Sequence, residues 1–70
     1  MMLIINGRAR ESASTSVAEL WREETSQLNL ESPKGYAIAL NGGVVRIDAW
    51  QATALSDGDR IEIVRAIQGG

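Results

Sequence analysis

The stretch MLIING at residues 2–7 decides the fold, because it is a short aliphatic run that stops at Asn6-Gly7. Asn-Gly is the strongest two-residue signal for a hairpin, since both residues tolerate the positive φ angles of a type I′ turn. Residues 2–6 are therefore predicted to form a strand that turns back into a second strand over residues 8–13. The second strand is polar and charged, which is typical of a sheet edge that must not pair with other chains.

A helix is predicted to follow this hairpin. Residues 16–19, SVAE, match a capping box, in which the Ser16 hydroxyl accepts from the N–H of Glu19 while the Glu19 carboxylate accepts from the N–H of Ser16. The helix should begin at Val17 and end near Leu28, before a loop over residues 29–35 that contains a proline and a glycine.

The predicted helix has one apolar face and one polar face. Its apolar stripe at helical spacing consists of Val17, Leu20, Trp21 and Leu28. The acidic residues Glu19, Glu23 and Glu24 are interpreted as part of a solvated face, with Glu19 also serving the cap. Trp21 is interpreted as a core residue rather than a ligand-stacking one.

The second half of the chain predicts another hairpin and a last strand. Residues 36–40 and 44–46 flank Asn41-Gly42-Gly43. Residues 47–55 have no clear period and favour a short helical turn that pins Trp50 against the core. Residues 56–59, SDGD, are interpreted as a tight turn rather than a cation site, because the further ligands of a calcium loop are missing. The last strand covers residues 60–64.

The order hairpin, helix, hairpin, short helix, strand indicates an α+β fold of two layers. It is the pattern of the β-grasp (ubiquitin-like) fold, a mixed sheet of about five strands packed on one helix plus a short helical turn. The last strand must then enter the middle of the sheet beside the first. The strand residues expected to face the helix are Leu3, Ile5, Ile38, Leu40, Ile61 and Ile63.

Composition excludes several kinds of site. The 70 residues include no cysteine and no histidine, so thiolate nucleophiles, zinc–thiolate sites and imidazole bases are absent. A net charge of −2 without basic clusters argues against nucleic acid as a partner. The longest apolar run, residues 1–5, is far below the roughly 20 residues of a membrane span and lacks the features of a signal peptide. We therefore expect a cytoplasmic protein without a membrane partner.

Several segments, in order, resemble the ThiS family of sulfur carriers in thiamine biosynthesis. They are residues 2–7 (MLIING), 16–20 (SVAEL), 37–42 (AIALNG), Trp50, 57–63 (DGDRIEI) and the pair Gly69-Gly70. Two features depart from the family pattern. A proline frequent before the basic residue near Arg46 is missing, and Gln68 stands where a third glycine is frequent.

The resemblance implies a carrier rather than an enzyme, with no bound cofactor. A ThiF-like adenylyltransferase would use ATP and Mg²⁺ to adenylate the carboxylate of Gly70. A donor system such as a cysteine desulfurase would then supply sulfur for a thiocarboxylate, which thiazole synthase (ThiG) would consume. Residues 1–64 would form the globular domain and residues 65–70 a flexible tail, of which Ile67, Gln68 and Gly69 enter partner active sites. The chain alone is expected to be a monomer.

The sheet face opposite the helix is predicted to be unusually apolar for a surface. It would carry Ile4, Ala37, Ala39, Glu62 and Val64, with Arg65 and Arg46 at its rim. We interpret it as the docking face for the adenylyltransferase, the alternative being ordinary exposed aliphatic residues. Two other functions remain open. One is a sulfur carrier for molybdopterin or another sulfur metabolite, and the other is a β-grasp interaction module without C-terminal chemistry.

Overall fold

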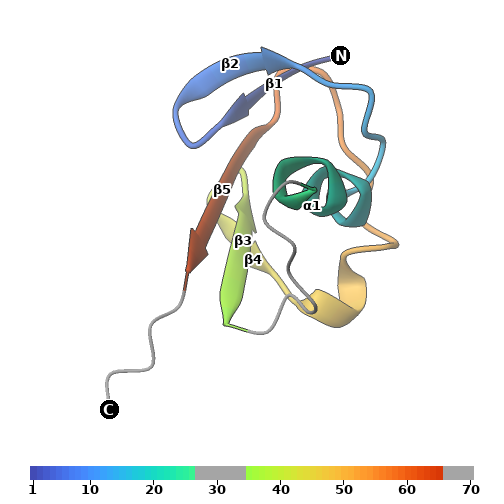
Figure 1. Ribbon diagram of the computed structural model, residues 1–70, viewed down its shortest axis with the longest axis vertical. Helices are drawn as coiled ribbons and strands as arrows, with labels where there is room; N and C mark the ends of the chain where they lie inside the picture. Colours follow the sequence, from blue (N-terminus) through green and yellow to red (C-terminus); the bar gives the residue numbers. More distant parts are fainter. Residues whose placement is uncertain (27–34, 66–70) are drawn as a thin grey trace.

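The computed structural model describes residues 1–26 and 35–65, which form a five-stranded mixed sheet covered on one face by a helix (Figure 1). The sheet order is β2-β1-β5-β3-β4. The elements in chain order are β1 (Met2–Ile5), β2 (Arg8–Glu11), α1 (Val17–Thr25), β3 (Tyr36–Leu40), β4 (Gly43–Val45), the 3₁₀ helix η1 (Ile47–Ala49) and β5 (Arg60–Arg65).

The last strand lies in the middle of the sheet, as predicted. β5 runs parallel to β1, with Ile5 opposite Ile61. On its other side it runs antiparallel to β3, with Ile38 opposite Ile63. β5 therefore joins the two hairpins, which α1 separates in the sequence, into one sheet.

Both Asn-Gly turns form as predicted. Asn6 and Asn41 each have φ of 50°, and the glycines after them, Gly7 and Gly42, have φ of 83° and 88°. In each hairpin the residues flanking the two-residue turn pair directly, as for Leu40 and Gly43. This geometry matches a type I′ turn, whose two central residues both need positive φ.

Four strands have bounds other than expected, and the first of them, β1, ends at Ile5 rather than at residue 6. β2 stops at Glu11 rather than residue 13, although Ser12 still exchanges two backbone hydrogen bonds of 2.8 Å with Met1. β4 covers Gly43–Val45 rather than 44–46, since the turn places Gly43 directly opposite the end of β3. β5 continues to Arg65, one residue past the expected end, because Tyr36 pairs with it.

The core lies between α1 and the sheet. Its buried hydrophobic residues are Leu3, Ile5, Val17, Leu20, Trp21, Ile38, Trp50, Leu55 and Ile61. Leu40 and Ile63, which were expected to face the helix, are only partly buried at the margin of this cluster. Leu55 is a core residue that the pattern did not single out. Leu28, the last residue of the expected helical stripe, lies outside the described residues.

The segment from η1 to Leu55 closes the core beside the start of α1. The indole N–H of Trp50 donates to the Val45 carbonyl at 2.8 Å, and its ring lies 5.3 Å from that of Trp21. This confirms that Trp50 is held against the core. The backbone N–H groups of Val17 and Ala18 donate to the carbonyls of Thr53 and Trp50. The segment thus provides acceptors for helix-start donors that have no partner within the helix.

The helix cap differs from the prediction in one contact. The Ser16 hydroxyl accepts from the Glu19 N–H at 3.2 Å, as expected. The Glu19 carboxylate, however, accepts from the N–H and the hydroxyl of Thr15, at 2.7 and 2.8 Å, rather than from the N–H of Ser16. Both the N–H and the hydroxyl of Thr15 donate to the same carboxylate oxygen of Glu19. The Thr15 backbone hydrogen bond is the main reason that the pKa of Glu19 is lowered from 4.5.

Glu23 is exposed, as expected of a solvated helix face, whereas Glu24 is largely covered. Glu23 accepts hydrogen bonds from the hydroxyls of the buried residues Ser12 and Ser14, at 3.0 and 3.4 Å. Glu24 pairs with Arg10 of β2, and its side chain is only 16% exposed. These carboxylates attach α1 to β2 and to the segment that connects them.

Residues 56–59 form the predicted turn. The Asp59 N–H donates to the Ser56 carbonyl at 3.0 Å, and Gly58 has φ of 88°. Both carboxylates of the turn accept backbone hydrogen bonds, Asp57 from the N–H of Met2 and Asp59 from the N–H of Ser56. The turn therefore places the start of β5 beside β1.

Candidate functional site: the open face and the end of the last strand

Strand alternation brings five of the predicted docking residues onto one face of the sheet. Ala37 lies opposite Val64, and Ala39 lies opposite Glu62. Ile38, between the two alanines, and Ile61, directly before Glu62, are fully buried under α1, while Ile63, between Glu62 and Val64, is partly buried. The face away from α1, here called the open face, therefore carries Ile4, Ala37, Ala39, Glu62 and Val64 together.

The pairing register adds residues that were not predicted. Val44 lies opposite Ala39 and Ala9 opposite Ile4, so both belong to the open face. Val44 is 76% exposed and Val64 is 51% exposed, which are high values for large aliphatic side chains. The Asn41-Gly42 turn was the signal for Val44, because a two-residue turn fixes the register of the hairpin.

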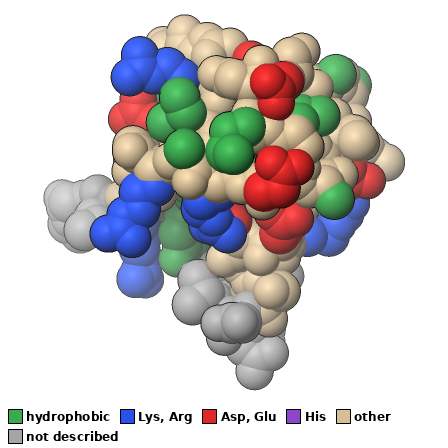
Figure 2. All heavy atoms as spheres, turned by 90° about the horizontal axis from the view of Figure 1, so that it is seen from above, with side chains coloured by type: hydrophobic (Ala, Val, Ile, Leu, Met, Phe, Trp, Pro, Cys, Tyr) green, Lys and Arg blue, Asp and Glu red, His purple; other side chains and the backbone are tan. Residues whose placement is uncertain are grey.

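Charged side chains surround and interrupt the apolar groups of the surface. In the view from the end that carries β2, small hydrophobic groups lie among acidic and basic side chains (Figure 2). On the open face itself, Arg60 and Glu62 stand two residues apart on β5, so their side chains project to the same side. Such a mixture of small apolar residues and both charges suits a protein partner rather than a polyanion.

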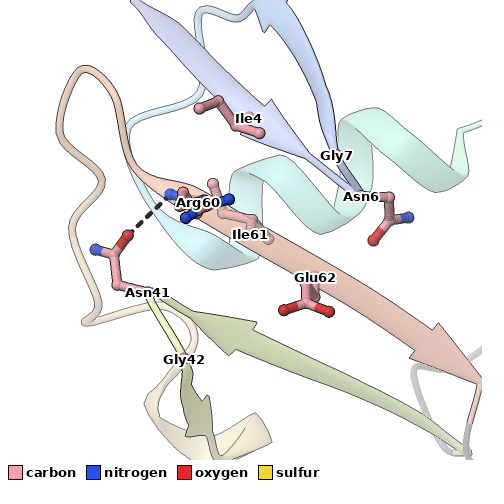
Figure 3. A pocket seen from close by; sticks show the side chains of 8 residues that line it. All are labelled: Ile4, Asn6, Gly7, Asn41, Gly42, Arg60, Ile61 and Glu62. Atoms are coloured by element: carbon pink, nitrogen blue, oxygen red, sulfur yellow. Dashed lines mark hydrogen bonds between the residues drawn. The ribbon is translucent and has the colours of Figure 1, made fainter.

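A shallow depression of about 720 Å³ lies at one end of the open face. Ile4, Arg60 and Glu62 line it between the two Asn-Gly turns, as Figure 3 shows. Because the sequence has no thiol and no imidazole, this depression offers no strong nucleophile or neutral-pH base. It can receive a side chain of a partner, but its residues give no sign of catalysis.

Two predicted rim residues are not part of the open face. Arg65 lies opposite Tyr36, whose ring packs against Trp21 in the core at 4.9 Å between centroids. Alternation from Ile61 and Ile63 puts Arg65 on the helix side as well. Arg46 follows the end of β4, and its guanidinium lies 3.6 Å from Asp48. Arg65 therefore lies on the helix side at the end of β5, and Arg46 directly follows the edge strand β4. A docking role of either residue stays a prediction.

The predicted modification site follows the last strand. β5 ends at Arg65, and Gly70, Gly69, Gln68 and Ile67 lie outside the described residues. Within residues 1–26 and 35–65, no group of three or more acidic side chains could hold a metal ion. In the same part of the chain, no helix has the length and apolar character that a membrane crossing requires.

A mixed sheet with the last strand central and parallel to the first, packed on one helix, is a β-grasp fold of the ubiquitin-like type. Residues 3–70 match the sequence profile of the ThiS family. The chain therefore belongs to the ThiS family.

Solved structures agree with this assignment. The chain is similar to the crystal structure of the thiamine biosynthesis protein ThiS from Geobacter metallireducens, with a TM-score of 0.76 and 30% identity over 100% of both chains. It is also similar to the solution NMR structure of a thiamine biosynthesis protein from the same organism. There the TM-score is 0.70 and the identity 32%, over 100% of this chain and 88% of the other. No curated protein sequence matches the chain significantly.

Proposed function

We propose that this chain is a sulfur carrier of thiamine biosynthesis that works through the carboxylate of Gly70. The observation that carries the proposal is the family match, which extends through the Gly69-Gly70 pair to residue 70. The thiamine biosynthesis proteins named above share its fold over the whole chain. The chain is then the substrate of its partner enzymes, not a catalyst.

The chemistry of a carboxylate explains why such a carrier needs an activating partner. An α-carboxyl group has a pKa of about 3.3 to 3.7, so it is ionised at neutral pH and is a poor electrophile. A ThiF-like adenylyltransferase, using ATP and Mg²⁺, joins the carboxylate of Gly70 to AMP with release of pyrophosphate. The terminal sulfur of a persulfide on the donor system then forms the C–S bond as AMP leaves, and a thiol cleaves the S–S bond of the resulting acyl disulfide, which releases the thiocarboxylate and leaves a disulfide. Thiazole synthase is the acceptor of the resulting thiocarboxylate sulfur.

The sequence after β5 suits delivery of this group to another active site. Residues 66–70 can span roughly 17 Å when extended, which is enough to reach beyond the end of a strand. Gly69 and Gly70 have no Cβ, so they fit narrow passages and adopt backbone angles closed to other residues.

The open face is our candidate docking surface for the adenylyltransferase. Ala37 and Ala39 are small, so a partner backbone or side chain can approach the sheet closely there. Val44 and Val64 give exposed apolar area to bury on either side of them. Arg60 and Glu62 add one charge of each sign, which can fix the register of docking.

The test of the proposed function is the intact mass of the protein after incubation with a ThiF-like adenylyltransferase, MgATP, a cysteine desulfurase with cysteine, and a thiol reductant that releases the thiocarboxylate from the acyl disulfide. The expected result is a mass gain equal to the difference between one sulfur and one oxygen atom. The same chain without Gly70 should show no gain, because the remaining terminus is one residue short of the activating site.

An unchanged mass of the full chain would contradict carrier function and favour a β-grasp interaction module. Transfer of the sulfur to a molybdopterin precursor, but not to the product of thiazole synthase, would instead assign the carrier to another pathway.

A further inference from the structure

The two flanks of β5 are paired to different extents. On the β3 side, the ladder continues from Leu40 opposite Ile61 to Tyr36 opposite Arg65. On the β1 side, pairing ends where Ile5 lies opposite Ile61, because β1 stops there. Among residues 1–26 and 35–65, no strand therefore lies on the β1 flank of β5 after Ile61.

The side chain of Asn6 accepts one more hydrogen bond from β5 on that flank. The parallel ladder contains the hydrogen bonds from Ile4 N–H to the Asp59 carbonyl and from Asn6 N–H to the Ile61 carbonyl, both 2.9 Å. In a continuing ladder, the carbonyl of residue 6 would accept from the Ile63 N–H next. The chain turns away at Asn6, whose φ is 50°, and the Asn6 side-chain oxygen accepts from the Ile63 N–H instead, at 2.9 Å.

The other Asn-Gly turn makes a similar contact with a different consequence. The side-chain oxygen of Asn41 accepts from the Arg60 N–H at 2.9 Å, and its amide donates to Asp59 at 3.0 Å. Figure 3 shows the two asparagines on opposite sides of β5. Asn41 acts at the start of β5, whose later residues are already held on that flank by β3. Asn6 acts on the later half, where no strand lies beside it.

We propose that Asn6 is a positioning residue for activation of the C-terminal carboxylate, an inference that rests on the proposed function. Ile63 is followed by Val64, which belongs to the open face, and by Arg65, the end of β5. A bond that holds Ile63 on its second flank fixes the point and direction from which residues 66–70 leave the sheet relative to the docked face. Small displacements of a reacting group lower its rate without weakening binding elsewhere.

The test compares Asn6→Gly with Asn41→Gly. Glycine adopts positive φ without strain, so each variant keeps its turn and removes only the side-chain amide. The carrier is used as substrate in ATP–pyrophosphate exchange by the adenylyltransferase, and kcat and KM are measured for each variant. Amide hydrogen exchange at Ile63 gives a readout that needs no partner.

For Asn6→Gly we expect kcat to fall about tenfold with KM within about twofold, and the Ile63 amide to exchange faster. Asn41→Gly removes two hydrogen bonds but should keep the parental kcat. Asn6→Asp should restore kcat, because aspartate tolerates the same φ and its carboxylate accepts from the Ile63 N–H.

Three outcomes would overturn the inference. They are a parental kcat for Asn6→Gly despite faster exchange at Ile63, a loss expressed in KM alone, and equal losses of kcat in Asn6→Gly and Asn41→Gly. Absence of exchange activity with the parent chain would instead overturn the proposed function itself, and the inference with it.

Discussion

Glu19 shows how one exposed side chain connects two elements. Its carboxylate holds Thr15 through two hydrogen bonds, while its backbone N–H donates to Ser16. The capping motif was visible in the sequence, and it correctly gave the helix start. The contact with Thr15 was not predictable from the motif, which specifies only the residues from Ser16 to Glu19.

Replacing Glu19 with glutamine should make the stability of the protein less dependent on acid pH. The pKa of Glu19 is lowered from 4.5 in the folded state, so its carboxylate stabilises the fold above that pH. This contribution is lost as the pH falls through the lowered folded-state pKa. Urea unfolding should therefore show parent and Glu19→Gln differing most near neutral pH and converging below pH 4.5.

Ser16→Ala is the control for this experiment. It removes the other half of the cap, at a cost of about 1 kcal/mol, but its hydroxyl does not titrate in this range. Its deficit should therefore persist at low pH. A constant difference between the parent and Glu19→Gln across the whole range would contradict the assigned role of the carboxylate.

The burial of polar side chains between α1 and the preceding segment could not be predicted from the sequence. Ser12 and Ser14 lie in a polar stretch that reads as exposed, yet both are buried. Their partner is Glu23 of α1, so their environment depends on where the helix packs. The pattern of neighbouring residues in the sequence does not predict that contact.

At the scale of elements, the turns explain why the strands were predicted well. Asn6-Gly7 and Asn41-Gly42 each fix a two-residue connection, and the register of both hairpins follows from it. The segment 47–55 was recognised only as a short helical turn. Its contact with the start of α1 went unpredicted, because backbone donors at a helix start can be satisfied by any part of the fold.

The second turn allows a matched test of backbone strain. Gly42 has φ of 88° and no atom within 4 Å of the position a Cβ would take, so Gly42→Ala should cost only its conformational strain. We expect a loss of about 1 to 2 kcal/mol in the free energy of unfolding, measured by urea denaturation. Gly43→Ala, at the next residue, should change stability by less than about 0.5 kcal/mol. Equal losses for both variants would show that the turn geometry is not the cause.

At the scale of the whole molecule, the open face draws on all five strands of the sheet. Alternation along β1, β3 and β5 predicted its first five members, because Leu3, Ile5, Ile38 and Ile61 had to face the helix. Arg65 was misplaced because β5 was expected to end at residue 64. As the last residue of β5 it follows the same alternation as Ile61 and Ile63, and so it lies on the helix side.

Ala39→Arg should block docking without unfolding the protein. Ala39 lies near the middle of the open face and directly opposite Glu62. An arginine there adds bulk to the docking surface, and its guanidinium can pair with Glu62, which keeps the charge compensated. We expect kcat/KM of adenylation to fall more than about tenfold, as for other central interface positions. The thermal midpoint and the circular dichroism spectrum should stay near those of the parent.

Ala52→Arg is the matched control, since Ala52 is exposed in the segment beside α1 and lies outside the open face. It introduces the same charge and should leave adenylation unchanged. Parental activity of Ala39→Arg, or equal inhibition by both substitutions, would contradict docking through the open face.

Because β5 is both the central strand and the last one in the sequence, the sheet can be completed only at the end of the protein's synthesis. Two hairpins and a helix are complete in the growing chain before residue 60, yet no strand pairing joins the two hairpins into one sheet until β5 is made. Pairing the first strand with the last is a contact of long sequence separation, which forms late because its loop-closure entropy is large. A chain that stops before β5 therefore lacks the central strand of the sheet and the part of the open face that β5 carries. Under the proposed function, only a molecule translated through its last strand would be a substrate for activation of its C-terminal carboxylate.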